Sequence, residues 1–370
     1  MKRAILIGVW IPVIILVEFI NWTCLALDFL FFPRFKKVTI KPPHFIIGMP
    51  RSATTFCYAL LLSDSRNISS MKLWEILLAP SIIQKKLILF IKQTDNHLNN
   101  IIYKTIYTID HHFFRQIDSI HPISLFNNEE DDYLFVHVFA SLSISFIFPE
   151  SDRILSLRKF DENLTKRQKH FLMSYYRSCI KRHLYVFGKE KRYLAKSPSH
   201  TPKIRTLMEY FPDCRFIYLL RNPLDAIAST ITLFQKFKEI FFLTLSKNEI
   251  IDLTLDLADS WYQYPLVSNK PLLNKAVFIV PFYQLVTHPY DSICGLYKKM
   301  NLEMSDSYCE SLRQIVLDSV NFKSRNRYLP EEFGLSRETI DKRYSFVYQI
   351  YSECENSKSY NHDKQFSFKT

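Results

Sequence analysis

The chain has 370 residues, of which 48% are hydrophobic and 15% aromatic, so it can bury a large core and is not a mostly disordered protein. A formal net charge of +12 indicates an anionic partner, such as a phosphorylated cofactor, an acidic glycan or a membrane surface. The sequence has no long Lys/Arg tract and no zinc-finger spacing, which argues against nucleic acid. Its seven scattered cysteines form no CxxC pair, so we expect free thiols and no metal site.

An apolar run over residues 4–32 opens the chain and is long enough to cross a bilayer, which takes about 20 residues. Pro12, Glu18, Asn21 and Asp28 interrupt it, so a tilted, re-entrant or interfacial helix pair remains open. No small-x-small site follows the run, which disfavours a cleaved signal peptide. We expect residues 1–41 to associate with a lipid bilayer, and the basic residues after the run mildly favour a cytosolic C-terminal side.

From Pro42 onward, short β-prone runs alternate with helical stretches, which predicts a parallel sheet covered on both faces. The expected fold is a three-layer α/β domain with a P-loop-like parallel sheet over 42–350, followed by a polar tail over 351–370. The predicted strands are 44–48, 193–195, 215–220 and 276–280. The predicted helices are 54–62, 72–92, 165–184, 200–210, 223–236, 249–264 and 289–300.

A strand, a turn and a helix around Phe45–Phe56 form the first candidate site. A helix N-terminus presents unpaired N–H groups and a partial positive charge, and here Arg51 and nearby hydroxyls surround it. The pattern therefore predicts an anion cradle. It is not the nucleotide-triphosphatase loop, because GxxxxGK[ST] is absent.

The second candidate site follows the strand at 215–220. Arg221 leaves the strand end, Pro223 starts a helix, and Ser229 lies nearly two turns along it. An arginine can grip a phosphate with two parallel hydrogen bonds while the hydroxyl donates another. An isolated strand-ending arginine is usually a surface ion-pair partner, but its conjunction with the first loop favours phosphate binding.

Five segments in this order resemble the sulfotransferases that use 3'-phosphoadenosine 5'-phosphosulfate (PAPS), in the branch with PRSGTT, KSPxH and RxPxDxxxS motifs. The three motif segments are Pro50-Arg-Ser-Ala-Thr-Thr55, Lys196-Ser-Pro-Ser-His200 and Arg221-Asn-Pro-Leu-Asp-Ala-Ile-Ala-Ser229. Two later stretches, Tyr283–Pro289 and Tyr328–Ser336, also resemble family segments. The resemblance covers about residues 44–340 and implies direct transfer of a sulfuryl group from PAPS to an acceptor hydroxyl, with no metal required.

The resemblance also implies roles for individual residues. Arg51 would contact the transferring group, and the loop residues Ser52, Ala53, Thr54 and Thr55 would hold the 5'-phosphosulfate. Arg221 and Ser229 would hold the 3'-phosphate. The family's loop glycine is Ala53 here, which disfavours positive φ, so the loop is expected to form if that residue is helical.

The chemical step needs a base for the acceptor and a group that stabilises the bridging oxygen. Lys196, beside His200, resembles the family lysine with the second role, and we count both as catalytic candidates. Trp74-Glu75 resembles a family pair whose glutamate is a base, and a partly buried Glu75 would have a raised pKa. The acidic run Glu129-Glu130-Asp131-Asp132 is the alternative, read as a solvated or substrate-facing patch.

Two other functions remain open on the sequence alone. A P-loop-type phosphotransferase is disfavoured by the missing GK[ST] and by the lack of a convincing Walker-B aspartate. A non-catalytic membrane adaptor with a degenerate fold has only Ala53 in its support. The acceptor is expected on a glycan, lipid or other membrane-proximal molecule, at a Golgi membrane in a eukaryote or the cytoplasmic face of the inner membrane in a bacterium.

Overall fold

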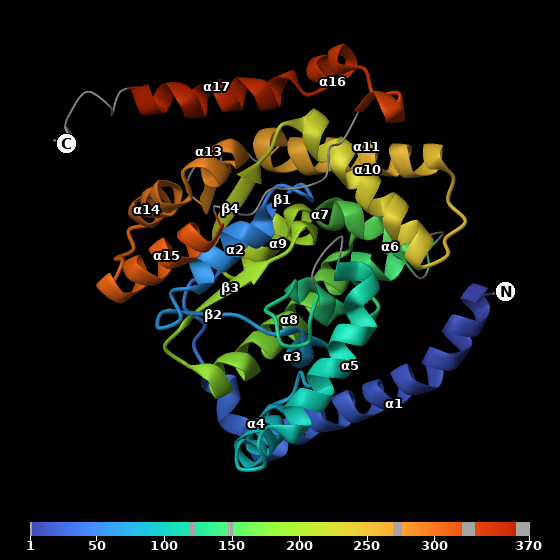
Figure 1. Cartoon of the computed structure of the whole chain (residues 1–370), viewed down its shortest axis with the longest axis vertical. Coiled ribbons are helices and arrows are strands. Elements are labelled where there is room, and N and C mark those ends of the chain that lie inside the picture. The colour runs from blue at the N-terminus through green and yellow to red at the C-terminus, as the bar shows by residue number, and fades with distance from the viewer. Residues whose placement is uncertain are drawn as a thin grey trace.

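The computed structural model describes residues 2–118, 123–146, 148, 151–268, 276–319 and 330–359. Its centre is a sheet of five parallel strands in the order β2-β3-β1-β4-β5 (Figure 1). The strands are β1 (His44–Gly48), β2 (Ile68–Ser69), β3 (Arg192–Lys196), β4 (Arg215–Leu220) and β5 (Val277–Pro281). From the central β1 the chain moves to one side of the sheet and later to the other, which makes its carboxyl edge a topological switch point.

Alternating side chains of the strands bury both faces of the sheet, as a parallel sheet requires. Phe45 and Phe216 point into a core built with α8, α9, α10 and α11, whereas Ile46 and Ile217 point into a second core built with α2, α14 and α15. The helices of the first core are α8 (Lys166–Phe187), α9 (Ile204–Tyr210), α10 (Pro223–Ile240) and α11 (Lys247–Gln263). Those of the second are α2 (Thr54–Leu62), α14 (Pro289–Lys299) and α15 (Asp306–Ser319).

The remaining elements connect or surround these layers. The helices are α1 (Lys2–Phe31), α3 (Leu73–Leu77), α4 (Ile82–Asn96), α5 (Ile101–Asp118), α6 (Asp152–Leu155), α7 (Phe160–Asn163), α13 (Phe282–Thr287), α16 (Arg337–Arg343) and α17 (Ser345–Ser359). The short turns include η1 (Pro33–Lys37), η2 (Asp131–Val138) and η5 (Pro198–Lys203). Figure 1 places α17 and α1 at opposite edges of the molecule.

The predicted α/β fold is confirmed, with local corrections. The expected helix 72–92 is two helices, α3 and α4, because Pro80 interrupts it and Ser81 caps the second by accepting a hydrogen bond from the Gln84 N–H at 3.1 Å. The expected helix 200–210 begins only at Ile204, after the η5 turn that contains Pro202. The short strand β2 and the helices α5, α15 and α17 were not predicted.

Packing extends beyond both expected boundaries of the domain. Phe35 and Val38 are buried, so the core begins before Pro42. At the other end, α17 continues to Ser359, and the Tyr351 hydroxyl donates to the Leu220 carbonyl oxygen at 2.5 Å, so residues 351–359 are not a polar tail. Residues 360–370, and residues 328 and 329 of the last family-like segment, lie outside the described residues.

The polar residues that interrupt the N-terminal apolar run face the domain. The Asn21 amide donates to the Leu77 carbonyl oxygen at 3.2 Å, and Asp28 accepts from Arg182 Nε at 2.7 Å and from the Ile82 N–H. Glu18 pairs with His137 at 2.7 Å. Within the described chain, one helix, Ile11–Phe31, has the length and apolar character of a membrane span, but its second half is docked on the domain.

Candidate active site

The carboxyl ends of β1, β3 and β4 bring the three motif segments together. Gly48 lies opposite Leu219 of β4, and a Cβ at Gly48 would lie 2.6 Å from the Leu219 carbonyl oxygen, so only glycine permits this approach. The Gly48 N–H donates to Thr201 Oγ1 at 3.0 Å, which ties the end of β1 to the turn after β3. The strand ends therefore form one edge from which all three loops leave.

The loop after β1 has two non-glycine residues in the left-handed region. Arg51 has φ 65° and Ala53 has φ 61°. Ala53 is therefore not helical, which was the condition on which the loop was expected to form: this residue takes the conformation that the family glycine would adopt freely, at a cost of about 1–2 kcal/mol. The chain nevertheless turns directly into α2, whose first residues are Thr54 and Thr55.

Ser52 is the residue of this loop whose surroundings best fit a bound ligand. Its side chain is fully buried at the N-terminus of α2, and its Oγ has no hydrogen-bond partner among the described residues. Buried hydroxyls almost always have a partner, so an orphaned one beside unpaired helix N–H groups fits a bound anion. Thr54 is buried beside it, whereas Thr55 is exposed.

The two phosphate-binding candidates of the sequence lie in a single cluster. Arg51 Nε donates to Ser229 Oγ at 3.2 Å, and Arg221 Nη1 donates to the Arg51 carbonyl oxygen. The Arg221 guanidinium lies 4.5 Å from the centre of the Phe282 ring, and the Tyr262 hydroxyl donates to the Arg221 carbonyl oxygen at 2.9 Å. Two guanidinium groups next to a helix N-terminus make this part of the sheet edge strongly electropositive.

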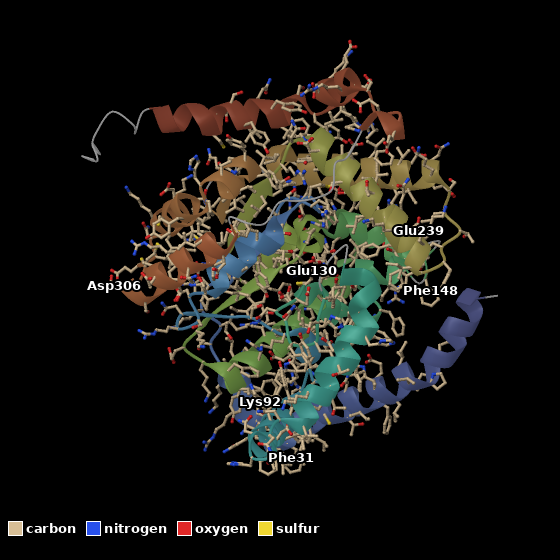
Figure 2. The ribbon with its side chains drawn as sticks, viewed as in Figure 1. Phe31, Lys92, Glu130, Phe148, Glu239 and Asp306 are labelled. Carbon is tan, nitrogen blue, oxygen red and sulfur yellow. The ribbon has the colours of Figure 1, made fainter. Side chains whose placement is uncertain are left out.

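Lys196 is paired with Glu130 at the end of β3. Its Nζ lies 3.2 Å from Glu130 Oε1, and Ser197 Oγ donates to Glu130 Oε2 at 3.0 Å. The Lys196 side chain is 1% exposed and the Glu130 side chain 20% exposed, so of the two it is the carboxylate that reaches solvent. Tyr58 of α2 lies under the lysine, with its ring centre 5.8 Å from Nζ. Figure 2 shows Glu130 near the middle of the molecule.

The rest of the acidic run is not a solvated patch, contrary to the sequence interpretation. Asp131 and Asp132 are buried and bind specific partners. Asp131 accepts hydrogen bonds from the hydroxyls of Tyr176 and Tyr193 and contacts His200 Nε2 at 2.8 Å. Asp132 pairs with Lys203; burial alone would raise the pKa of this carboxyl, but Lys203 and His200 lower it overall. Only Glu130 of these three carboxylates is partly exposed.

Glu75 has a different environment from the one expected for a tuned base. Its side chain is 2% exposed, Oε1 accepts from the Lys72 N–H at 3.0 Å, and Oε2 contacts His183 Nδ1 at 2.8 Å. Burial would raise the pKa of Glu75, but His183, Lys85 and the Lys72 N–H together lower it. The expected raised pKa is therefore wrong, and the carboxylate serves as the capping group of α3.

His200 lies inside the core. Its ring is fully buried, with the rings of Phe45 and Tyr176 each 5.7 Å away. Nε2 contacts Asp131, and Nδ1 has no partner within the described chain. This geometry suits a residue that holds the acidic run in place beneath Lys196.

Sequence reasoning did not identify Tyr58 or His183. Tyr58 follows Thr54 by one helical turn, so the helical repeat alone would have placed both side chains on one face of α2. Its hydroxyl bonds Ser70 Oγ; burial, and then the nearby Asp131, Glu129 and Glu75, raise the pKa of Tyr58 well above its usual value. No sequence signal pairs His183 of α8 with Glu75, because 108 residues separate them.

The fold and this edge of the sheet define a sulfotransferase. The model of the Sulfotransferase family matches residues 42–306, and the chain belongs to that family. Among curated proteins, the omega-hydroxy-beta-dihydromenaquinone-9 sulfotransferase Stf3 of Mycobacterium bovis is 24% identical over 323 residues, which cover 85% of this chain and 76% of that protein. The Stf3 protein of Mycobacterium tuberculosis has the same identity and coverage.

Solved structures agree with the fold. The sulfotransferase STF9 of Mycobacterium avium superposes with a TM-score of 0.66 at 18% identity, covering 87% of this chain and 80% of that one. The sulfotransferase STF1 of Mycobacterium tuberculosis has a TM-score of 0.64 at 17% identity, and the match covers 89% of this chain and 83% of that one. Among the described residues, no group of three His, Cys, Asp or Glu side chains is arranged to hold a metal ion.

Proposed function

We propose that this sulfotransferase takes its sulfuryl group from PAPS and transfers it to the hydroxyl of a membrane-proximal lipid. The observation that supports the donor most directly is the buried, unpartnered Ser52 hydroxyl at the N-terminus of α2, beside the Arg51, Arg221 and Ser229 cluster. That arrangement suits a nucleotide with phosphate groups at both ends, because it offers separate sets of donors close together.

The donor would use each part of the cluster differently. Ser52, Thr54, Thr55 and the N–H groups of the Ala53–α2 turn would hold the 5'-phosphosulfate, and Arg221 with Ser229 the 3'-phosphate. Arg51 already reaches Ser229 with Nε, so a small rotation of its side chain would let it contact the sulfuryl group. Lys196, at the end of the adjacent strand, would stabilise the negative charge that grows on the bridging oxygen as the S–O bond breaks.

Glu130 is the base that this geometry favours over Glu75. It is partly exposed, it lies 3.2 Å from Lys196, and Ser197 orients it. In the transfer step, the Glu130 carboxylate takes the proton of the acceptor hydroxyl while the acceptor oxygen forms a bond to sulfur. The bond from sulfur to the bridging oxygen breaks, and its electron pair stays on adenosine 3',5'-bisphosphate. His200 would act through Asp131 as a positioning residue.

A lipid acceptor is supported by two observations. The relative Stf3 acts, by its name, on a hydroxylated menaquinone, which is a membrane lipid. The exposed apolar helix α1 would keep this chain at a bilayer, where such acceptors are concentrated. The localisation proposed is therefore membrane-associated.

Two measurements test this function. Adenosine 3',5'-bisphosphate should raise the melting temperature of the full-length chain, and AMP should do so far less, because AMP lacks the 3'-phosphate. Radiolabelled PAPS should then transfer its label to a fraction of lipid alcohols. Equal stabilisation by ATP with no response to the bisphosphate would contradict the donor, whereas transfer only to glycans or small alcohols would contradict the lipid acceptor.

A further inference from the structure

The outer face of α1 is apolar and has no protein covering it within the described chain. Its side chains Ile15, Leu16, Phe19, Leu30 and Phe31 are each more than half exposed. The opposite face carries the buried Asn21, Leu25 and Asp28, spaced as one helical stripe on the domain. From Ile11 to Leu16 every residue is exposed, so the first half of the helix projects beyond the domain.

The helices α4 and α5 form a hairpin with the same character. Leu87 and Phe90 on α4, and Ile101, Ile109 and Phe113 on α5, are each more than half exposed. The hairpin is held from within, because the Asp95 carboxylate accepts from the N–H groups of Ile102 and Tyr103. Helix α4 packs against both α1 and α5, so the three helices are contiguous. Figure 2 shows Phe31 and Lys92 at the same end of the molecule.

Charges are segregated on this surface, which comprises residues 11–37 and 82–114. Its four carboxylates, Glu18, Asp28, Asp95 and Asp110, all accept hydrogen bonds from protein groups. The exposed charges are all positive: Arg34, Lys36, Lys37, Lys86, Lys92 and Lys104. Lys36 Nζ lies 4.6 Å from the centre of the Phe29 ring, and Lys86 Nζ lies 4.7 Å from the centre of the Phe32 ring. Apolar side chains bordered only by cations match the interface of an anionic bilayer.

The contacts that α1 makes with the domain are incompatible with a helix that crosses the bilayer. The apolar residues 4–17, which precede Glu18, extend about 21 Å at about 1.5 Å per residue, whereas the hydrocarbon core is about 30 Å thick. A span would have to include residues 18–31, but Glu18 and Asp28 are paired there with His137 and Arg182 of the domain. Bringing those charges into hydrocarbon would be strongly unfavourable.

We propose that α1, α4 and α5 together form a monotopic membrane-docking surface for an anionic bilayer, with α1 lying in the interface and not across it. The proposal extends the membrane association included in the proposed function, and its tests need neither PAPS nor transfer. In this arrangement the bilayer covers the apolar faces of α1 and of the α4–α5 hairpin at once, and the six cations face the headgroups.

Vesicle flotation of the full-length chain tests the surface. Phe90→Glu should weaken binding to phosphatidylcholine vesicles that contain phosphatidylglycerol by roughly tenfold, because an aromatic contact with the bilayer is replaced by a charge. Leu317→Glu on α15 is the matched control, since Leu317 is 64% exposed and Phe90 is 65% exposed. Lys92→Glu should weaken binding by roughly fivefold only when phosphatidylglycerol is present, whereas Lys299→Glu, with the same change in net charge, should not.

The topology needs a second measurement. The chain is reconstituted into preformed vesicles so that the domain remains outside, and a membrane-impermeant maleimide is applied. The cysteines of the Lys2→Cys and Leu317→Cys variants should be labelled equally without detergent. Because seven native cysteines are also present, the label is assigned to each site by peptide mapping. Protection of Lys2→Cys until detergent is added would show a span and overturn the in-plane arrangement.

Other outcomes would overturn the surface itself. If the Phe90→Glu variant floats with vesicles as well as the unaltered chain does, the α4–α5 hairpin is not part of the membrane-docking surface. A loss of self-association in that variant, with flotation intact, would show that the hairpin binds a second copy of the chain. Normal melting temperatures of the variants distinguish either result from misfolding.

Discussion

At the scale of single residues, the central question is which carboxylate receives the acceptor proton. Glu130→Gln should lower kcat by roughly 10²-fold, because the amide cannot take the proton, while the affinity for adenosine 3',5'-bisphosphate changes little. Glu75→Gln should instead lower the melting temperature, because the contact between Glu75 Oε2 and His183 loses its charge. Single-turnover rates and thermal unfolding of both variants provide the comparison.

The two variants also serve as each other's control. If Glu75→Gln abolishes turnover at normal stability and Glu130→Gln remains active, the base is Glu75 and the Lys196–Glu130 pair is structural. The pKa of Glu75 is lowered, so this carboxylate is ionised at neutral pH but is a weaker proton acceptor than an ordinary glutamate.

His44 gives a prediction about pH. Burial, and then Arg192 and Arg215, lower the pKa of His44 to about 3, so the folded protein holds this ring neutral. An unfolded chain protonates it near pH 6.5, and protonation therefore favours unfolding. The contribution of His44 to the free energy of unfolding should be fully present above pH 6.5. As the pH falls from 6.5 to 3, the free energy of unfolding should decrease by up to about 1.4 kcal/mol per pH unit.

Denaturant unfolding at several pH values measures this effect. His44→Gln removes the titrating group and should flatten the pH dependence over that window, even if the variant is less stable at neutral pH. A curve of unchanged slope in His44→Gln would mean that other groups cause the loss. Asp132, whose pKa is lowered, acts in the same direction. Its contribution to the free energy of unfolding is fully present above the usual pKa of an aspartate and is lost as the pH falls toward the lower pKa of the folded state.

The sequence predicted where the loop of the proposed anion cradle lies in the fold but not its internal geometry. The order and spacing of the motif segments were enough to predict that three features lie at the ends of adjacent strands: the loop of residues 50–55, Lys196 and Arg221. The left-handed conformation of Ala53 was not foreseeable from backbone propensity, which disfavours it for alanine. The pairing of Lys196 with Glu130 joins residues 66 positions apart, and no local pattern encodes it.

At the scale of elements, α1 is attached to α8 through a buried ion pair. The side chains of Asp28 and Arg182 are 0% and 3% exposed, and Arg182 also lies 4.2 Å from the centre of the Phe35 ring. Asp28→Ala should lower the free energy of unfolding by roughly 3–5 kcal/mol, because it leaves the guanidinium buried without its counter-ion. The measurement is denaturant unfolding in a mild detergent.

A double variant isolates the cause of that loss. Asp28→Leu combined with Arg182→Met replaces the pair with apolar groups and should recover much of the stability. Arg313→Met, at an exposed pair with Glu310, is a control in which little should change. If Asp28→Ala is neutral, α1 is held by its apolar contacts alone.

The elements that the sequence misjudged are those whose form depends on what lies beside them. Asp28 and Asn21 look like interruptions of a membrane span because hydropathy does not show toward which side of the helix a side chain points. In the fold both lie on the face of α1 that docks on the domain. The helix α5 has a one-sided apolar pattern, but in the fold apolar side chains such as Ile101, Ile109 and Phe113 are exposed, so the pattern does not mark packing on the core. The strands β1, β3, β4 and β5 were read correctly from their continuous apolar runs, whereas the two-residue strand β2 was missed.

At the scale of the whole molecule, the chain is one packed unit from α1 to α17, with the proposed anion cradle at the sheet edge and an apolar, cation-bordered surface on α1, α4 and α5. The contacts of Glu18 and Asn21 link the two regions: His137 bridges Glu18 and the Ile76 carbonyl oxygen, and Asn21 binds Leu77, so α1 supports the short helix that carries Glu75. The helices α1 and α3 therefore share one set of buried hydrogen bonds.

Removal of residues 1–41 should therefore destabilise the domain and not simply release it from the membrane. The shortened chain would lose the buried Leu25, Phe35 and Val38 and leave Arg182 without Asp28, and α3 would lose its support. We expect a melting temperature well below that of the full-length chain in detergent, and weaker stabilisation by adenosine 3',5'-bisphosphate. Arg182→Met in the shortened chain should restore part of the lost stability, because the unpaired charge is then gone. A shortened chain that melts at the full-length temperature and binds the bisphosphate equally well would show that α1 is only a tether.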